Sequence, residues 1–281
     1  MRLFAAGLFL LCTLAPAYAQ TARTQAETVY MSAIGAMSSL KEPPFVTYTM
    51  RGEPRGFAVD LFIQNHFVWL DIHEGDEPSL WQVRHRTDDY ASELLLPSGT
   101  RYVSRRSFFD PTWFGAFRAL RDGMLNYQDV EMPVSSRATP PPEVSSNVHE
   151  IAVINVIGPT IYWVEDRGAA VCPNGAPAHA LHLRSRDRDP RHQLNDVMID
   201  NQTMRFCMIR YGIADSFGFH GIVEQHYAQV GRYWVQTDGL LDGTMRVFGI
   251  SMHHGKWVYR LDDLAFPDRI PSTAFLTPFT Q

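Results

Sequence analysis

The chain has 281 residues, a net charge of −5 and a pI near 6.1. A weakly acidic protein presents no basic field to phosphates, so this balance argues against nucleic-acid binding. Hydrophobic residues make up 45% of the chain and charged residues 20%, which is ordinary for a folded protein and argues against disorder.

Residues 1–19 have the three parts of a secretory signal peptide. Arg2 supplies the positive charge, residues 5–14 are apolar, and Ala17-Tyr18-Ala19 forms a cleavage site of the small-x-small type. Lipid attachment at Cys12 is the rival interpretation, but bulky leucines precede this cysteine where an acylation site needs small residues. The apolar run is too short to span a bilayer. We therefore expect an exported protein, periplasmic or extracellular, that is not an integral membrane protein.

The N-terminal half, residues 24–130, is predicted to contain two helices and a set of strands. Apolar residues recur every three or four positions over 24–42, which predicts an amphipathic helix. A second helix is predicted over 110–124, with Asp110 as its N-cap and Pro111 at its first position. The apolar stripe of this second helix either packs in the core or forms a lid over a cavity. Strands are predicted between the helices at 45–51, 57–63, 67–72, 80–86, 92–96 and 101–105.

Residues 131–148 are rich in proline and have no periodicity, which predicts an exposed linker. A ladder of strands follows over 149–281, where short segments alternate between apolar and polar residues. Loops this short connect only antiparallel neighbours, so we expect residues 20–281 to form a single antiparallel β domain. A hairpin at 200–203 is predicted to pair Ile199 with Met204. The expected strands of the ladder are 151–157, 178–185, 194–200, 203–211, 220–227, 233–237, 244–251 and 257–261.

Two cysteines remain after the signal peptide, Cys172 and Cys207. Cysteine pairs in exported proteins usually form disulfides, so we predict a Cys172–Cys207 bond. The alternative is a buried, free Cys207 packed within a strand.

No motif for catalysis or cofactor binding occurs in the chain. We find no nucleophile elbow, no zinc-protease HExxH, no P-loop and no dinucleotide fingerprint. We therefore expect no enzyme activity, no catalytic residues, no metal site and no cofactor.

Aromatic residues make up 12% of the chain, and all of its 11 methionines except Met1 follow the signal peptide. Such side chains form adaptable apolar surfaces. If the sheet curves over the helices, they would line a pocket suited to a hydrocarbon chain. The competing interpretation is that they fill the core by packing on one another. The candidate ligand-binding residues are Trp69, Trp113, Phe114, Phe117, Phe206, Tyr233 and Phe248.

The order of elements resembles the LolA-like superfamily of periplasmic lipoprotein carriers and related lipid-binding proteins. The resemblance includes a helix ending Ser38-Ser39-Leu40 that leads directly into the strand at 45–51, and the turn at 199–204. It also includes the segment 227–234 and the C-terminal segment 264–275. The family's Arg-Pro-x-x-Phe-Arg segment is not found, so no site residue is carried over.

The resemblance implies a mainly β, α+β fold: a highly curved antiparallel sheet, or incomplete β-barrel, with helices packed on its concave side. It implies a non-enzymatic binder or carrier of a hydrophobic ligand, such as a lipid or an acylated lipoprotein, with a lipoprotein or envelope protein as partner. The alternative function is an exported protein-interaction module with a filled core and no ligand.

Overall fold

The computed structural model describes residues 24–55, 59–64, 67–72, 79–95, 101–104, 109–122, 157–187, 193–214, 219–247 and 250–275. The predicted signal peptide, the linker at 131–148 and almost all of the strand expected at 151–157 lie outside these residues.

The described elements are two α-helices, thirteen strands and a short 3₁₀ helix. In chain order they are α1 (Gln25–Ser38), β1 (Phe45–Arg55), β2 (Val59–Gln64), β3 (Phe67–Ile72), β4 (Ser79–Arg86), β5 (Ala91–Leu95), β6 (Arg101–Ser104), α2 (Trp113–Asp122), β7 (Tyr162–Val171), β8 (Pro177–Ser185), β9 (Leu194–Asp200), β10 (Phe206–Ala214), β11 (Phe219–Val230), β12 (Tyr233–Val247), β13 (Ile250–Ala265) and η2 (Ser272–Phe275).

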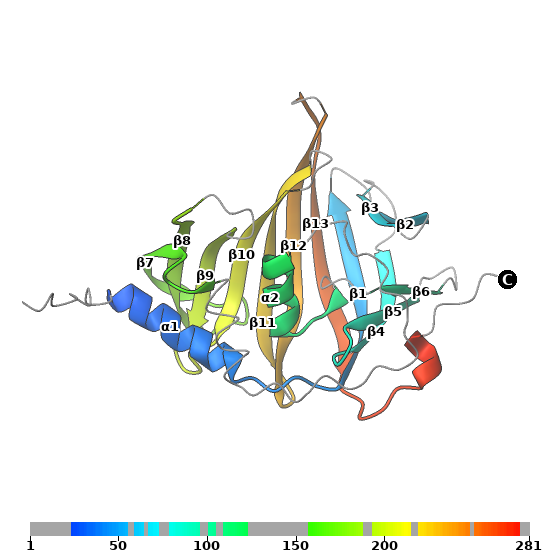
Figure 1. Ribbon diagram of the computed structural model, residues 1–281, viewed down its shortest axis with the longest axis horizontal. Helices are drawn as coiled ribbons and strands as arrows, with labels where there is room; N and C mark the ends of the chain where they lie inside the picture. The colour runs from blue at the N-terminus through cyan, green and yellow to red at the C-terminus, as the bar shows by residue number, and fades with distance from the viewer. Residues whose placement is uncertain are drawn as a thin grey trace, which may run out of the picture.

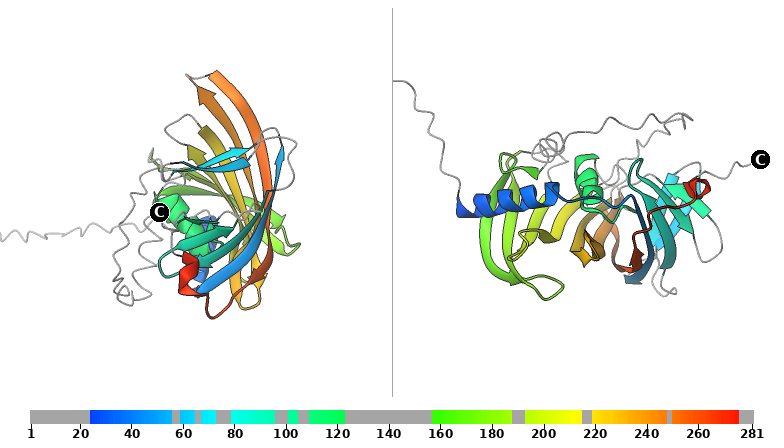
Figure 2. Two further views of the ribbon diagram at one scale, coloured as in Figure 1. Left: turned by 90° about the vertical axis from the view of Figure 1, so that its right-hand side faces the viewer. Right: turned by 90° about the horizontal axis from the view of Figure 1, so that it is seen from below.

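Eleven of these strands form one antiparallel sheet in the order β6-β5-β4-β1-β13-β12-β11-β10-β9-β8-β7 (Figure 1). Within the described part of the chain, the edge strands β6 and β7 do not pair with each other, so the sheet is not closed. Figure 2 shows that the sheet is curved. The prediction of a mainly β, antiparallel protein is confirmed. β2 and β3 form a separate two-stranded sheet.

The two halves of the chain join inside the sheet, where β1 and β13 are its fourth and fifth strands. β1 pairs with β4 on one side and with β13 on the other, where Met50 lies opposite Leu261. The strands on either side of the predicted linker therefore belong to one sheet.

Two strands are longer than the sequence pattern predicts. The segments expected at 233–237 and 244–251 are parts of one continuous β12 and its hairpin with β13, and the segment expected at 257–261 lies within β13. Gly239 lies on β12 between the two predicted segments, and the side chain of Tyr259 packs directly against its backbone. A Cβ at this position would lie 2.5 Å from the Tyr259 hydroxyl. β7 was not predicted, because its residues from Glu165 to Ala169 lack apolar alternation.

The predicted register of the β9–β10 hairpin is wrong. Ile199 pairs with Phe206 instead of Met204. The turn is longer than expected because the Asp200 carboxylate accepts the backbone N–H groups of Gln202 at 2.9 Å and Thr203 at 2.7 Å. Met204 then has φ 55°, a left-handed conformation that ends the turn.

The helix α1 begins at a capping box, in which Thr24 accepts the Glu27 N–H and the Glu27 side chain accepts the Thr24 N–H. Its buried face includes Tyr30, whose hydroxyl donates to the carbonyl of Ile157 at 2.6 Å. The helix ends at Ser38, four residues before the predicted end.

The helix α2 begins at Trp113 instead of Asp110. The two residues before it are held by β12: the carbonyl of Pro111 accepts the Gln236 N–H at 2.8 Å, and Thr112 forms a β-bridge with Val235. Both helices contact the ring of Phe206 on β10, so they lie on the same face of the sheet.

Candidate functional site

A cluster of aromatic rings lies between the helices and the sheet. The ring of Trp113, from α2, lies 5.3 Å from that of Phe206 on β10 and 6.3 Å from that of Tyr227 on β11. The ring of Tyr30, from α1, lies 5.9 Å from that of Phe206. All four side chains are at most 2% exposed. This aromatic cluster is closed to solvent in the structure.

The structure brings two of the predicted ligand residues, Trp113 and Phe206, into this cluster. Phe117 is buried one helical turn after Trp113, and Phe114 is partly buried against the core. Trp113, Phe114 and Phe117 lie within the first two turns of α2, and Phe206 lies on β10.

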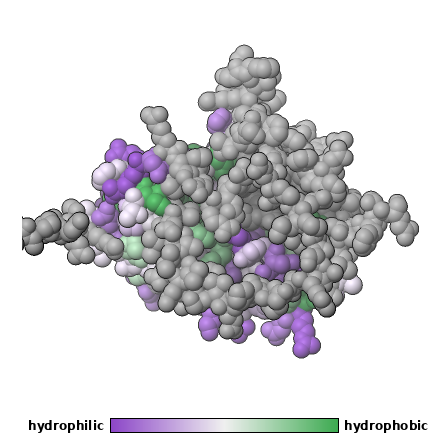
Figure 3. Space-filling view, viewed as in Figure 1, coloured by the Kyte–Doolittle hydropathy of each residue, from purple (hydrophilic) through white to green (hydrophobic). Residues whose placement is uncertain are grey.

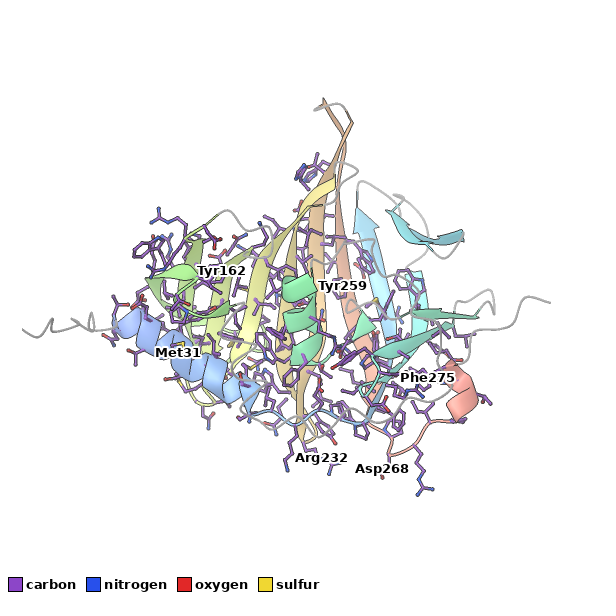
Figure 4. The ribbon with its side chains drawn as sticks, viewed as in Figure 1. Met31, Tyr162, Arg232, Tyr259, Asp268 and Phe275 are labelled. Carbon is purple, nitrogen blue, oxygen red and sulfur yellow. A yellow bond between two sulfur atoms is a disulfide. The ribbon has the colours of Figure 1, made fainter. Side chains whose placement is uncertain are left out.

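Tyr233 lies apart from this group. Its ring contacts that of Phe266 at 4.7 Å, and the guanidinium of Arg232 lies over it. Arg232, next to Tyr233 in the chain, is labelled at the lower edge of the molecule in Figure 4. Figure 3, in the same view, shows hydrophilic side chains along this edge. Trp69 lies on β3, outside the main sheet, and Phe248 lies outside the described residues.

A buried polar cluster fastens the start of α2 to the sheet. The carboxylate of Asp110 forms an ion pair with Arg118 and accepts the Thr112 N–H at 2.9 Å. His85, on β4, shares a 2.9 Å hydrogen bond between its Nδ1 and the hydroxyl of Ser92 on β5, and its Nε2 lies 3.3 Å from Asp110 Oδ1. We call Asp110, Arg118, His85 and Ser92 the α2 anchor.

Serine, histidine and aspartate are also the residue types of a hydrolase triad. The surroundings of Ser92, His85 and Asp110, however, differ from those of a catalytic triad. All three are at most 1% exposed, whereas a nucleophile must reach its substrate. Burial, together with the positive charge of Arg118, lowers the pKa of His85 to about 3, which makes it a poor general base. We interpret these residues as structural. Sequence reasoning missed them because no motif spacing joins them, and Asp110 was predicted only as a helix cap.

A network of buried amide and hydroxyl groups lies on the same face of the sheet. Gln225 Nε2 donates to Gln236 Oε1 at 3.1 Å, and Gln236 Nε2 donates to the hydroxyl of Tyr259 at 2.7 Å. The hydroxyl of Tyr227 donates to Gln225 Oε1 at 3.1 Å. These groups satisfy one another, so the core face beneath α2 is not purely apolar. Tyr259, on β13, is labelled in Figure 4.

The opposite face of the sheet carries a row of ion pairs that crosses five strands. Successive side chains of a strand alternate between the two faces, and these residues alternate with buried ones. From β8 to β12 the row consists of His182–Asp196 at 2.8 Å, Asp196–Arg210 at 3.4 Å, Arg210–Glu224 at 2.8 Å, Glu224–His226 at 2.8 Å, and the contact between His226 and Asp238. We call these six residues the ion-pair row.

A groove of about 400 Å³ lies beside the end of this row, over β1, β12 and β13. Its lining includes Arg51, Asp238, Arg260 and Asp262, and Asp262 lies 3.3 Å from Arg51 and 3.1 Å from Arg260. The charged residues of its lining are the arginines Arg51 and Arg260 and the carboxylates Glu53, Asp238 and Asp262, so the groove has a slight excess of negative charge.

The ion-pair row makes the stability of the protein depend on pH. Burial lowers the pKa of His226, but its hydrogen bonds with Asp238 and Glu224 outweigh burial and raise this pKa to about 9. The hydrogen bond from His226, opposed by burial and aided by Arg210, lowers the pKa of Glu224 to about 2.

We expect the row to stabilise the protein most between about pH 4.5 and pH 6.5. The contribution of His226 is complete below its ordinary pKa of 6.5 and is lost as the pH rises through about 9. The contribution of Glu224 is complete above its ordinary pKa of 4.5 and is lost as the pH falls through about 2.

The test is urea unfolding from pH 3 to pH 10 of the wild type and the His226→Gln variant. The variant should be less stable by about 1–3 kcal/mol at pH 6, and its loss of stability between pH 6.5 and 9 should be smaller. His254→Gln is the matched control, since His254 pairs with Asp242 at a position where its side chain is 67% exposed. Parallel pH profiles for the wild type and His226→Gln would contradict this prediction.

The disulfide predicted between Cys172 and Cys207 is confirmed, with a Cα–Cα distance of 5.8 Å. Cys172 lies in the turn between β7 and β8, and Cys207 is the extra residue of a bulge at the start of β10. The bond therefore connects strands that are separated in the sheet by β8 and β9.

Among the described residues, no group of three or more histidine, cysteine, aspartate or glutamate side chains is arranged to hold a metal ion. Neither described helix has the length and apolar character needed to cross a membrane. No family model, curated protein or solved structure matches the chain.

Proposed function

We propose that the protein binds the apolar chain of a lipid or an acylated peptide between α2 and the concave face of the curved sheet. In this proposal α2 is a movable cover, and the aromatic cluster is the surface that receives the chain. The protein is then an exported, non-enzymatic binder or carrier of the LolA-like kind.

The observation that carries the proposal is the way α2 is held. Trp113, Phe117 and Leu120 are buried on one side of this helix, and Trp113 rests on aromatic rings of the sheet. The polar contacts described between the sheet and the segment that leads into α2 come from residues 109–112, including the Tyr48 hydroxyl of β1, which donates to the Phe109 carbonyl at 2.7 Å. Within α2, Arg118 pairs with Asp110 and lies over the ring of Tyr90. A helix fastened at residues 109–112 and at Arg118, with the rest of its described buried side apolar, can swing about these contacts and expose the cluster. Because Phe117 and Leu120 are buried beneath α2 here, binding requires this movement.

The open sheet supports the same proposal. A closed small barrel is filled by its own side chains, whereas an open sheet with a detachable helix can admit a chain-like molecule. The secretory pattern of residues 1–19 and the Cys172–Cys207 disulfide both fit a protein that works in an oxidising, exported compartment.

A protein-interaction module is the second candidate. The full burial of the aromatic cluster favours it, because a filled core needs no ligand. In that case the face with the ion-pair row and the adjoining groove is the surface available to a partner.

The test of ligand binding is titration with fluorescent fatty-acyl probes of increasing chain length. We expect saturable binding whose affinity rises with length, since each buried methylene contributes on the order of 0.8 kcal/mol. Phe117→Asp places a charge on the apolar side of α2 and should weaken binding at least tenfold.

The matched control is Trp163→Asp, which makes a similar change on β7 at a side chain that is 49% exposed. Circular dichroism of each variant establishes that it is folded. If folded wild-type protein binds no probe at any length, the interaction module replaces the carrier as the proposed function.

A further inference from the structure

Trp113 has a buried donor without a hydrogen-bond partner. The side chain is 1% exposed, and its indole Nε1 makes no hydrogen bond in the described structure. Trp234 shows the usual arrangement: it is also buried, and its Nε1 donates to the carbonyl of Phe206 at 3.0 Å. Buried indole N–H groups generally find such a partner, so the state of Trp113 calls for an explanation.

The polar groups near Trp113 are used elsewhere. The ring of Tyr227 contacts that of Trp113, but the hydroxyl of Tyr227 donates to Gln225. Gln225 and Gln236 are bonded to each other, and Gln236 also donates to Tyr259. No group of this amide network accepts the Trp113 N–H, although the network lies on the same face of the sheet as Trp113.

Resting on the function proposed above, we infer that the ligand is not a plain hydrocarbon but an acyl chain whose carbonyl oxygen accepts the N–H of Trp113. The esters of lipids and the N-acyl amides of acylated peptides share this carbonyl. Binding would then supply an acceptor to the buried Trp113 N–H, and the hydrogen bond gained would favour the complex.

The position of Trp113 fits this role. It is the first residue of α2, next to Thr112 and Pro111, which bind β12. This end of the helix moves least if α2 swings about its anchor. A carbonyl held here would fix the head of the chain, while the rest of the chain lies along the apolar side that continues through Phe117 and Leu120.

The test compares wild type with Trp113→Phe, which keeps an aromatic ring and removes the donor. Competitors of equal chain length displace a fluorescent acyl probe: a methyl ester, an N-methyl amide and the corresponding hydrocarbon. The ratio of dissociation constants between variant and wild type is taken for each competitor, so that differences in solubility cancel.

We expect the ester and the amide to bind about tenfold more weakly to the variant, and the hydrocarbon to bind equally to both proteins. A loss for only one of the two carbonyl compounds identifies the natural source as lipid ester or peptide amide.

Trp234→Phe is the matched control, because the Trp234 N–H already has its acceptor in Phe206. It should leave the ratios of ester, amide and hydrocarbon unchanged. A second measurement is the indole N–H proton resonance of Trp113, assigned by its loss in Trp113→Phe. It should move downfield when the ester binds and stay in place when the hydrocarbon binds.

Equal loss of ester and hydrocarbon binding in Trp113→Phe would overturn the inference while leaving the proposed function standing. That result would show that the ring of Trp113 contributes packing and that the edge of its indole is satisfied by the ring of Tyr227. Failure of the wild type to bind any competitor or probe would instead overturn the proposed function, and this inference with it.

Discussion

Replacing Asp110 by alanine is expected to lower the free energy of unfolding by about 3–5 kcal/mol, because it removes one partner of a buried ion pair. Asp110 is 1% exposed, and its partner Arg118 is 7% exposed. Without the carboxylate, the buried guanidinium of Arg118 loses this ion pair, and the Thr112 N–H loses its acceptor. The start of α2 should therefore detach from the sheet before the rest of the molecule unfolds.

The measurement is urea unfolding followed by tryptophan fluorescence, with hydrogen exchange of α2 as the local probe. Asp268→Ala is the matched control, because Asp268 is exposed on the lower edge of the molecule (Figure 4), and it should change stability by less than about 0.5 kcal/mol. Asp110→Asn should lie between the two, since the amide oxygen can still cap Thr112. If Asp110→Ala is as stable as Asp268→Ala, the α2 anchor does not hold the helix.

Removing the disulfide should cost about 2–4 kcal/mol, since the bond closes a loop between residues 35 apart in the sequence. The Cys172→Ala/Cys207→Ala variant should therefore unfold at lower urea than the oxidised wild type. The wild type in reductant should unfold close to the variant, and reductant should leave the variant itself unchanged.

Intact-mass analysis after alkylation checks the bond directly. Protein recovered from the exported fraction should carry no alkyl group without reductant and two after reduction. Two alkylated thiols without reductant, or an oxidised wild type no more stable than the variant, would contradict this prediction.

The sequence was most informative where a pattern depends on local geometry. The repeated apolar positions predicted a helix from residue 24, and α1 begins at Gln25. The alternation of apolar residues located most strands within a few positions. The cysteine count identified the Cys172–Cys207 bond because only one pairing was possible after the signal peptide.

Strand partners and register could not be predicted in the same way. A period of two shows which side chains share a face but not which strand lies alongside, so the pairing of β1 with β13 was not foreseen. At Ile199 the register depended on a side chain, because the Asp200 carboxylate accepts two backbone N–H groups and so lengthens the turn.

The α2 anchor was missed because His85, Ser92 and Asp110 meet only after β4, β5 and α2 have been brought together. Of the aromatic ligand candidates, Trp113 and Phe206 contact each other in the structure, whereas the ring of Tyr233 contacts that of Phe266.

The pairing of β1 with β13 has a consequence for how the protein folds. Arg51 on β1 donates a hydrogen bond to Asp262 on β13 at 3.3 Å, although the two residues are 211 positions apart in the sequence. Contacts between such distant residues are slow to form, because a large loop must close before they return any stabilisation. β1 cannot gain its second neighbour until β13 has been synthesised, so during translation β1 and β4–β6 remain separated from the ladder of β7–β12. The complete sheet can therefore form only after β13, near the end of the described chain, has been synthesised.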